Sequence, residues 1–215
     1  MSSGRETKSR SVKFPTLSPF DLQHQQSDVA SKIVVGLERV AEIFRVLLWN
    51  YAKDLNLSPI QIQILIFLKY HEEDRSTVSY LAQEFNLARP TISDAVAALQ
   101  TKGLVDKIRS VEDSRSSSIR LTKEGEQSVR ATECFANPFT QIVADLSETE
   151  KVAFWSVLSR IIYKANQEGL ISVQRMCFNC KFYEPRKEKS YCHLLAKELR
   201  SQDIRIDCPE FIVGV

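Results

Sequence analysis

The stretch VSYLAQEFNLARPTISDAVAALQTKG, residues 78–103, decides the fold of this chain. Ser76 or Thr77 can cap a short helix over VSYLAQEF, because both hydroxyls suit the N-cap position. The tripeptide NLA makes a tight turn, and a second helix follows that ends at Gly103. The apolar residues of this second helix recur on one face: Ile92, Val96 and Leu99. Two short helices joined by a tight turn predict a helix-turn-helix.

A charged hairpin is predicted directly after this motif. LVDKIRSV (104–111) and SSIRLT (117–122) can each form a short strand, and EDSRS lies between them. Helix, turn, helix and hairpin make a winged helix. The expected fold class is therefore mainly α, with a small β-hairpin wing and long dimerisation helices.

Long helices are predicted before the motif. Ser27 or Asp28 can cap the first, whose apolar residues recur at helical spacing as far as Tyr51. Ser58 caps the next, with Pro59 in its first turn. The segment IQILIFLKYH is apolar on most of its circumference, which indicates a helix buried by several neighbours.

Two further helices are predicted after the wing. Thr122 caps one that continues through ATECFANPFTQIVADL, where Pro138 should kink or break it. Ser147 and Glu150 form a capping box for the final long helix, which runs to about Gly169.

The composition is that of a soluble globular protein, with 43% hydrophobic and 26% charged residues. No apolar run approaches the roughly 20 residues that span a bilayer, and the first residues lack the apolar core of a secretory signal. We therefore expect a cytoplasmic protein. Residues 1–26 show no helical or strand period and are expected to form a flexible leader. Residues 27–172 would form the winged-helix and dimerisation domain, and residues 173–215 a cysteine-rich segment.

Four features carry a resemblance to a known family. They are TISDAVAALQTKGLV (91–105), VEDSRSSSIRLTKEG (111–125), the long first helix and the two helices after the wing. Over residues 27–170 the chain resembles the MarR family of bacterial winged-helix regulators. The resemblance implies a homodimer with interleaved terminal helices, a pseudo-palindromic operator in double-stranded DNA and a ligand-responsive cleft.

The first turns of the second motif helix carry candidate DNA contacts, because a recognition helix reads base edges from its N-terminal turns. Arg89 is a candidate for guanine or phosphate. Thr91 and Ser93 are candidates for phosphate contact or for local capping. The helix departs from the family pattern at two positions. Ala88 stands where a capping residue such as Ser is expected, and Pro90 removes a base contact while suiting the first turn.

The wing supplies the other candidate DNA contacts. Arg115 is the candidate for the minor groove, since narrow A·T-rich grooves attract guanidinium groups. Asp113 would brace Arg115 by a charge-assisted bond, and the alternative is a salt bridge that only shapes the hairpin. Arg109 and Arg120 add positive charge to the strands. Between residues 89 and 123 there are seven basic residues and four acidic ones, a modest excess that coincides with the motif.

The last segment holds four of the five cysteines: Cys177, Cys180, Cys192 and Cys208. They are separated by 2, 11 and 15 residues, and the close pair puts two sulfurs within reach of one ion. Disulfides or inert thiols are the alternative, which a reducing compartment disfavours. A segment of about forty residues is too small to bury a core, so metal binding would fold it. Cys134 stands alone and is expected to be a buried, inert thiol.

The cysteine pattern leaves two metals open, because thiolates select zinc or iron–sulfur clusters. The aromatic residues near the cysteines, and Pro209 after Cys208, resemble high-potential iron–sulfur proteins and favour a [4Fe–4S] cluster. Asp207 stands where those proteins carry an aromatic residue, and zinc is the alternative. His193 is expected outside the ligand set, since four cysteines already complete it.

These features predict a dimeric DNA-binding transcriptional regulator, expected to be a repressor, whose DNA affinity is tuned by the metal centre. A small-molecule or redox effector is a further expected partner. The alternative is a redox or electron-transfer protein that uses the winged helix only for assembly. The sequence has no Gly-rich phosphate loop and no activated-nucleophile motif, so no enzymatic activity is expected.

Overall fold

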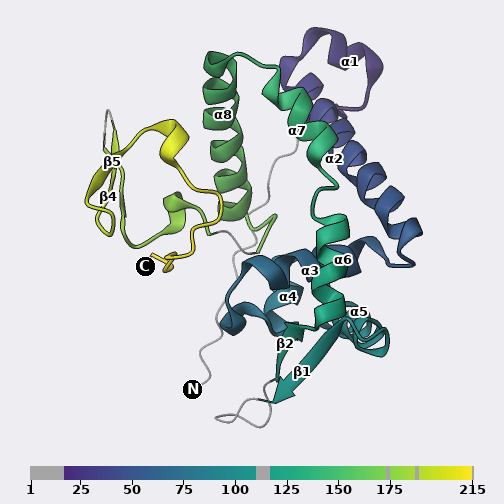
Figure 1. Cartoon of the computed structure of the whole chain (residues 1–215). Coiled ribbons are helices and arrows are strands. Elements are labelled where there is room, and N and C mark those ends of the chain that lie inside the picture. Colours follow the sequence, from purple (N-terminus) through teal and green to yellow (C-terminus); the bar gives the residue numbers. More distant parts are fainter. Residues whose placement is uncertain (1–16, 110–116, 173–174, 187–188, 215) are drawn as a thin grey trace, which may run out of the picture. The chain divides into compact units, whose positions relative to one another are not determined.

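The structure is a computed structural model that describes residues 17–109, 117–172, 175–186 and 189–214. The chain forms two compact units, residues 1–46 and 47–215. Figure 1 shows the helices and strands of the whole chain. Among the described residues, no helix is long and apolar enough to cross a membrane.

The first unit contains α1 (Leu22–Ser27) and most of α2 (Val29–Asp54), the helix that crosses into the second unit. Asp21 caps α1 by accepting a hydrogen bond from the His24 backbone. The prediction of a structureless leader up to residue 26 was therefore wrong for residues 22–26. Asp28, one of the two predicted caps of the long helix, accepts hydrogen bonds from the backbone and hydroxyl of Ser31.

Helix α3 (Pro59–Tyr70) is the buried helix that the sequence predicts. Ser58 and Gln61 form a capping box at its start, which satisfies two backbone donors that a helix leaves free. Its inward residues belong to the core of the second unit: Ile62, Ile64, Leu65 and Phe67. A short 3-10 turn, η1 (Glu73–Arg75), connects it to the next helix.

The helix-turn-helix consists of α4 (Val78–Glu84) and α5 (Arg89–Thr101), as predicted. Thr77 is the cap of α4, and its side chain accepts from the Tyr80 backbone. Asn86 makes the turn with a positive φ of 55°, a conformation that Asn tolerates better than most residues. Six apolar residues of the two helices are buried in the common core: Leu81, Ala82, Ile92, Ala95, Val96 and Leu99.

The wing is an antiparallel pair, β1 (Val105–Arg109) and β2 (Ser117–Leu121), in which Val105 lies opposite Leu121. The buried Ile119 side chain joins the core of the helix-turn-helix. Its backbone N–H donates to the Ser76 carbonyl at 2.7 Å. The winged helix predicted from the sequence is confirmed.

Three helices follow the wing: α6 (Lys123–Thr132), α7 (Asn137–Ala144) and α8 (Glu148–Gln167). Thr122 caps α6 and Ser147 forms the predicted capping box with Glu150 on α8. The predicted break near Pro138 is present, but it lies earlier, at residues 133–136. Pro138 stands in the first turn of α7, where a missing N–H costs nothing.

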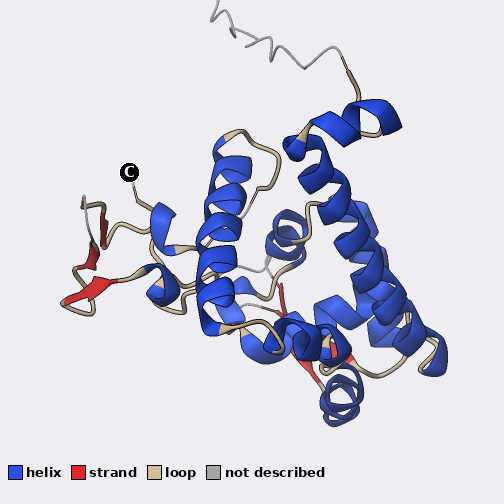
Figure 2. Cartoon of the chain, turned by 90° about the horizontal axis from the view of Figure 1, so that it is seen from above, coloured by secondary structure: helices blue, strands red, loops and turns tan. Residues whose placement is uncertain are grey.

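The segment after α8 has its own small fold (Figure 2). A turn, η2 (Cys177–Asn179), precedes three short strands: β3 (Tyr183–Glu184), β4 (Ser190–Cys192) and β5 (Lys197–Leu199). The strands form an antiparallel sheet in the order β3-β4-β5, and η3 (Ser201–Asp203) follows. Met176, Leu199 and Ile204 form a small core that packs on Trp155 and Ile162 of α8. We call residues 175–214 the cysteine module.

Candidate nucleic-acid interface and cysteine module

The N-terminal end of α5 presents the predicted recognition residues. Arg89 and Thr91 are exposed, Ser93 is half-buried, and the next apolar position, Ile92, is fully buried. Ala88 occupies the N-cap and makes no side-chain hydrogen bond, as its residue type dictates. This end of the helix therefore keeps backbone N–H groups and the Arg89 guanidinium on an accessible face, which suits a polyanion.

The wing residues divide into three groups. Arg109 closes β1 opposite Ser117, whereas Asp113 and Arg115 lie outside the described residues, so their predicted roles stay predictions. Arg120 donates to both carboxylate oxygens of Glu73 in η1. These hydrogen bonds hold the pKa of Glu73 below its ordinary value. Arg120 thus braces the wing against the motif, and a DNA phosphate would have to compete with Glu73 for it.

The four cysteines of the module line one small cavity of about 30 Å³. Cys177 and Cys180 lie at the two ends of η2, where the Cys180 N–H donates to the Cys177 carbonyl at 2.9 Å. Cys192 ends β4, and the Cys208 N–H donates to the Arg175 carbonyl at 3.3 Å. Four positions spread over 32 residues of sequence thereby border one cavity, and their role as a common ligand set stays a prediction.

Burial and hydrogen bonding shift the pKa of two of these thiols. Burial raises the pKa of Cys177 and of Cys208, and a hydrogen bond to Glu210 raises that of Cys208 further. The Arg205 backbone donates to the Cys177 sulfur at 3.3 Å, and the Arg205 guanidinium donates to the Cys208 sulfur at 3.5 Å. Burial therefore favours the neutral form of the Cys177 and Cys208 thiols.

The donor set fits a thiolate-binding metal, although the thiols do not converge on one point as they stand. Among the described residues, no three Cys, His, Asp or Glu side chains are close enough together to hold one ion. Cysteine side chains can change between staggered rotamers without movement of the backbone. Four thiols that line one cavity could therefore still reach a common ion. His193 is exposed and pairs with Glu184 at 2.8 Å, away from the cavity lining.

Cys134 corrects one prediction. The sequence suggested a buried, inert thiol, but the residue lies just after α6 and is exposed. The helix ends at Thr132, so the turn that follows carries Cys134 away from the buried face. Cys134 lies outside the cysteine module, so it provides a control cysteine for substitutions within the module.

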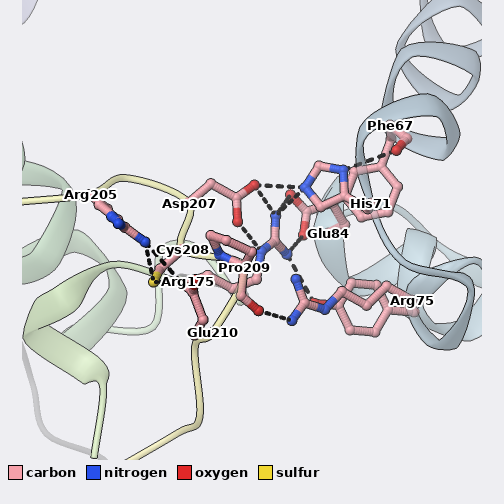
Figure 3. Close-up of polar contacts among 11 residues, drawn as sticks. Phe67, His71, Arg75, Glu84, Arg175, Arg205, Asp207, Cys208, Pro209 and Glu210 are labelled. Atoms are coloured by element: carbon pink, nitrogen blue, oxygen red, sulfur yellow. Dashed lines mark hydrogen bonds and ion pairs between the residues drawn. The ribbon is translucent and has the colours of Figure 1, made fainter. Parts of the chain in front are cut away.

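Arg175 connects the cysteine module to the helix-turn-helix (Figure 3). Its guanidinium, with 6% of the side chain exposed, donates to the carboxylates of Glu84 at the end of α4 and of Asp207 beside Cys208. Tyr80 accepts a further hydrogen bond at 2.9 Å, and His71 pairs with Asp207 at 2.7 Å. Burial alone would raise the pKa of Asp207, but its bonds to Arg175 and His71 hold it well below the ordinary value.

Sequence reasoning missed the Arg175 network, because its members are 91 and 32 residues apart along the chain. The available signal was weak: an arginine two residues before the first module cysteine and an acid directly before the last one.

A larger cavity, of about 1490 Å³, lies between α4, the end of α8 and the module. Its lining mixes aromatic, amide and basic side chains, among them Tyr80, Tyr163, Asn166, Phe178 and Lys181. This lining can accommodate an organic molecule with both apolar and polar groups.

Comparisons with known proteins point to the winged helix. Residues 55–116 match the model of the MarR family. The structure is similar to the S. aureus MepR–DNA complex, with 22% identity over 61% of this chain and 96% of that one and a TM-score of 0.55. It is also similar to the transcriptional regulator PA3341, with 24% identity, 63% and 98% coverage and the same TM-score of 0.55. None of the curated proteins compared is similar to this chain. The fold is therefore that of a MarR-type winged helix-turn-helix.

Proposed function

We propose that this chain is a DNA-binding transcriptional regulator of the MarR type. The observation that carries the proposal is the exposed N-terminal end of α5, with Arg89 and Thr91, in a winged helix whose residues 55–116 match the family model. An exposed guanidinium at a recognition-helix terminus can pair with guanine or with phosphate. The DNA complex of the similar protein MepR supports the same mode of action.

We propose that the regulator acts as a homodimer. On α2, Ile33 and Val34 are exposed, and on α8, Phe154 and Val157 are exposed, which leaves apolar side chains in water on both helices. Covering such side chains with a second copy removes that cost. A two-fold dimer would read a pseudo-palindromic operator, with half-sites about one helical turn of DNA apart.

Repression is the simplest regulatory outcome, since a dimer seated on an operator excludes other proteins from the same DNA. The expected effector, a small molecule or a redox signal, would act on this bound state. The cavity between α4, α8 and the cysteine module offers the place for a small molecule, because a ligand there would contact Tyr80 on the helix-turn-helix.

The test is selection of duplexes from random DNA, followed by affinity measurements at several salt concentrations. A regulator should enrich one sequence and lose affinity steeply with salt, because phosphate contacts release counterions. Arg89→Ala should weaken binding by about 1–3 kcal/mol. The control is Arg186→Ala, a substitution in the cysteine module where Arg186 pairs with Glu184. Failure to enrich any sequence would favour the alternative of a redox protein that uses the winged helix only for assembly.

We also propose that the state of the cysteine module tunes DNA affinity. Arg175 supports this, because its buried guanidinium ties Asp207 of the module to Glu84 of α4. Helix α4 in turn packs on α5 through Leu81 and Ala82. Loosening the link should let α4 shift and weaken operator binding by roughly 5–150-fold, the usual range of coupling between sites.

Arg175→Met and the milder Glu84→Gln test this link through operator affinity, with dimer mass and circular dichroism as checks of folding. His193→Ala is the control, since it changes the module without touching α4. Unchanged operator affinity in both folded variants would remove Arg175 from the regulation of DNA binding.

A further inference from the structure

The four cysteines of the module come from three separate pieces of backbone that border one cavity. Cys177 and Cys180 are supplied by the turn η2, Cys192 by the end of β4, and Cys208 by the loop after η3. A close pair followed by two distant cysteines is enough for a tetrahedral set of thiolates. The cysteines are free thiols in the structure, so all four sulfurs are available as ligands.

The cysteine module has too little core to hold its fold by burial alone. Among its described residues, the buried apolar side chains are Met176, Leu199 and Ile204, and the strands β3, β4 and β5 have two or three residues each. Small folds of this size usually need a disulfide or a metal as a staple. Four thiols on one cavity, without a disulfide among them, favour the metal.

The need for a staple favours zinc over a cluster. Zinc takes four thiolates in a closed tetrahedral shell and contributes folding free energy directly. In the structure the four thiols line the cavity without converging on one point, so their side chains would have to turn toward the ion.

Arg205 faces two of the sulfurs with two different donors. Its backbone N–H lies 3.3 Å from the Cys177 sulfur, and its guanidinium Nη1 lies 3.5 Å from the Cys208 sulfur. Four thiolates around a divalent ion leave a net charge of −2, and N–H donors from outside the ligand set stabilise that charge. Glu210 accepts a hydrogen bond from the same Nη1 at 2.8 Å and holds the guanidinium beside Cys208.

We propose that Cys177, Cys180, Cys192 and Cys208 bind a single zinc ion and that Arg205 is a positioning residue for Cys177 and Cys208. The site is closed, with four protein ligands and no open coordination position, so it is structural rather than catalytic. The ion joins both ends of η2 to Cys208, and Asp207 next to it is thereby kept in reach of Arg175. The proposal stands independently of DNA binding, because metal content is measured without an operator.

The experiment is metal analysis of the full-length protein purified without oxygen and without chelator, together with its absorption spectrum. We expect one zinc per chain and no visible absorption. Replacement by Co²⁺ should give the absorption bands of a tetrahedral thiolate site. Cys192→Ser should lose the zinc, whereas Cys134→Ser, which changes the exposed cysteine outside the module, should keep it.

Arg205→Met tests the positioning role through competition with a chromogenic chelator. The affinity for zinc should fall about 10–100-fold, the usual effect of losing a partner outside the ligand set. Arg200→Met is the matched control in the same module, because Arg200 pairs with Asp203 and not with a sulfur. Unchanged zinc affinity in Arg205→Met would overturn the positioning role.

Two results would overturn the metal assignment. Four iron and four sulfide per chain, with a broad visible absorption, would replace the single ion by the cluster. Disulfides among the four cysteines in the anaerobic protein, with no uptake of Co²⁺, would remove the metal site altogether. Because wild-type protein answers both questions, they do not depend on whether the Cys192→Ser variant folds.

Discussion

At the scale of single residues, Arg175 is a buried cation whose charge is balanced by two carboxylates and whose guanidinium lies near two aromatic rings. Glu84 and Asp207 supply the charges, and the rings of Phe67 and Tyr80 lie 5.6 and 6.0 Å from its guanidinium carbon. Such a group contributes more to specificity of packing than to net stability, since desolvation offsets much of the attraction. Losing one partner is costly, because it leaves the other charge buried and unpaired.

Gly125 is a residue with no room for a side chain. A Cβ at this position would stand 2.0 Å from the Leu104 carbonyl oxygen, a backbone atom that cannot turn aside. Gly125→Ala should therefore lower the free energy of unfolding by about 1–3 kcal/mol or more, as overpacking does. The measurement is urea denaturation.

Gly36→Ala is the control, since a Cβ there meets nothing within 4 Å. In a helix interior this substitution should stabilise by about 0.5–1 kcal/mol. Equal effects of the two substitutions would contradict the predicted contact at Gly125.

The Glu133 carboxylate should make the free energy of unfolding depend on pH in acidic solution. Its carboxylate accepts from the Tyr70 hydroxyl at 2.6 Å and from the Lys69 ammonium at 2.9 Å, and these bonds lower its pKa below the ordinary 4.5. A carboxylate whose pKa is lower in the folded state than in the unfolded state stabilises the fold at pH values above its unfolded-state pKa. This contribution to the free energy of unfolding is lost as the pH falls through the folded-state pKa.

The comparison is between wild type and Glu133→Gln. Wild type should be the more stable near neutral pH, and the difference should shrink as the pH falls below 4.5. Denaturant melts across this range measure it. A difference that persists unchanged in acid would show that the carboxylate charge is not responsible.

At the scale of helices and strands, capping residues in the sequence predicted where most of the helices begin. The remaining boundaries depend on contacts with distant parts of the chain. The helices α3, α4, α6 and α8 each begin at a capping residue that the sequence predicted, namely Ser58, Thr77, Thr122 and Ser147. The short α1 and the two- and three-residue strands of the cysteine module were missed, because elements of that length have too few residues to show a period. Pro138 marked a break, but a proline also suits a first helical turn, so its sequence position alone could not locate the boundary.

Helix α5 lacks a cap, and this gives a stabilising prediction. Ala88 has the extended backbone of an N-cap residue (φ −64°, ψ 141°) but no side-chain acceptor. Ala88→Ser should raise the free energy of unfolding by about 0.5–2 kcal/mol. Thr77→Ala, which removes the existing cap of α4, should lower it by a similar amount. Thermal denaturation of the two variants checks both signs, and destabilisation by Ala88→Ser would refute the capping argument.

At the scale of the whole molecule, the sequence predicted the winged helix and the cysteine-rich segment but not the contacts that join them. The winged helix and the four-cysteine set could be read from local spacing. The link through Arg175, Glu84 and Asp207 could not, because a single arginine and two acids are too common to signal a contact between distant segments. The predicted DNA contacts of Asp113 and Arg115 stay predictions.

Assembly gives the prediction that belongs to this scale. Phe154 on α8 is 51% exposed, which is costly for an aromatic side chain unless a second copy covers it. Phe154→Asp should convert the proposed dimer to a monomer, because an unpaired carboxylate would be buried in the interface. Light scattering at micromolar concentration measures the mass. Ile206→Asp, at a similarly exposed apolar residue of the cysteine module, is the control and should leave the dimer intact.

The hydrogen bond from the Ile119 amide to the Ser76 carbonyl has a consequence for hydrogen exchange. Ile119 is fully buried, so its amide should exchange only when the whole winged helix unfolds. The amide of its exposed neighbour Arg120 should instead be able to exchange through local opening of the strand pair. The wing is therefore anchored to the core at Ile119, and local opening of its strand pair should not loosen the helix-turn-helix.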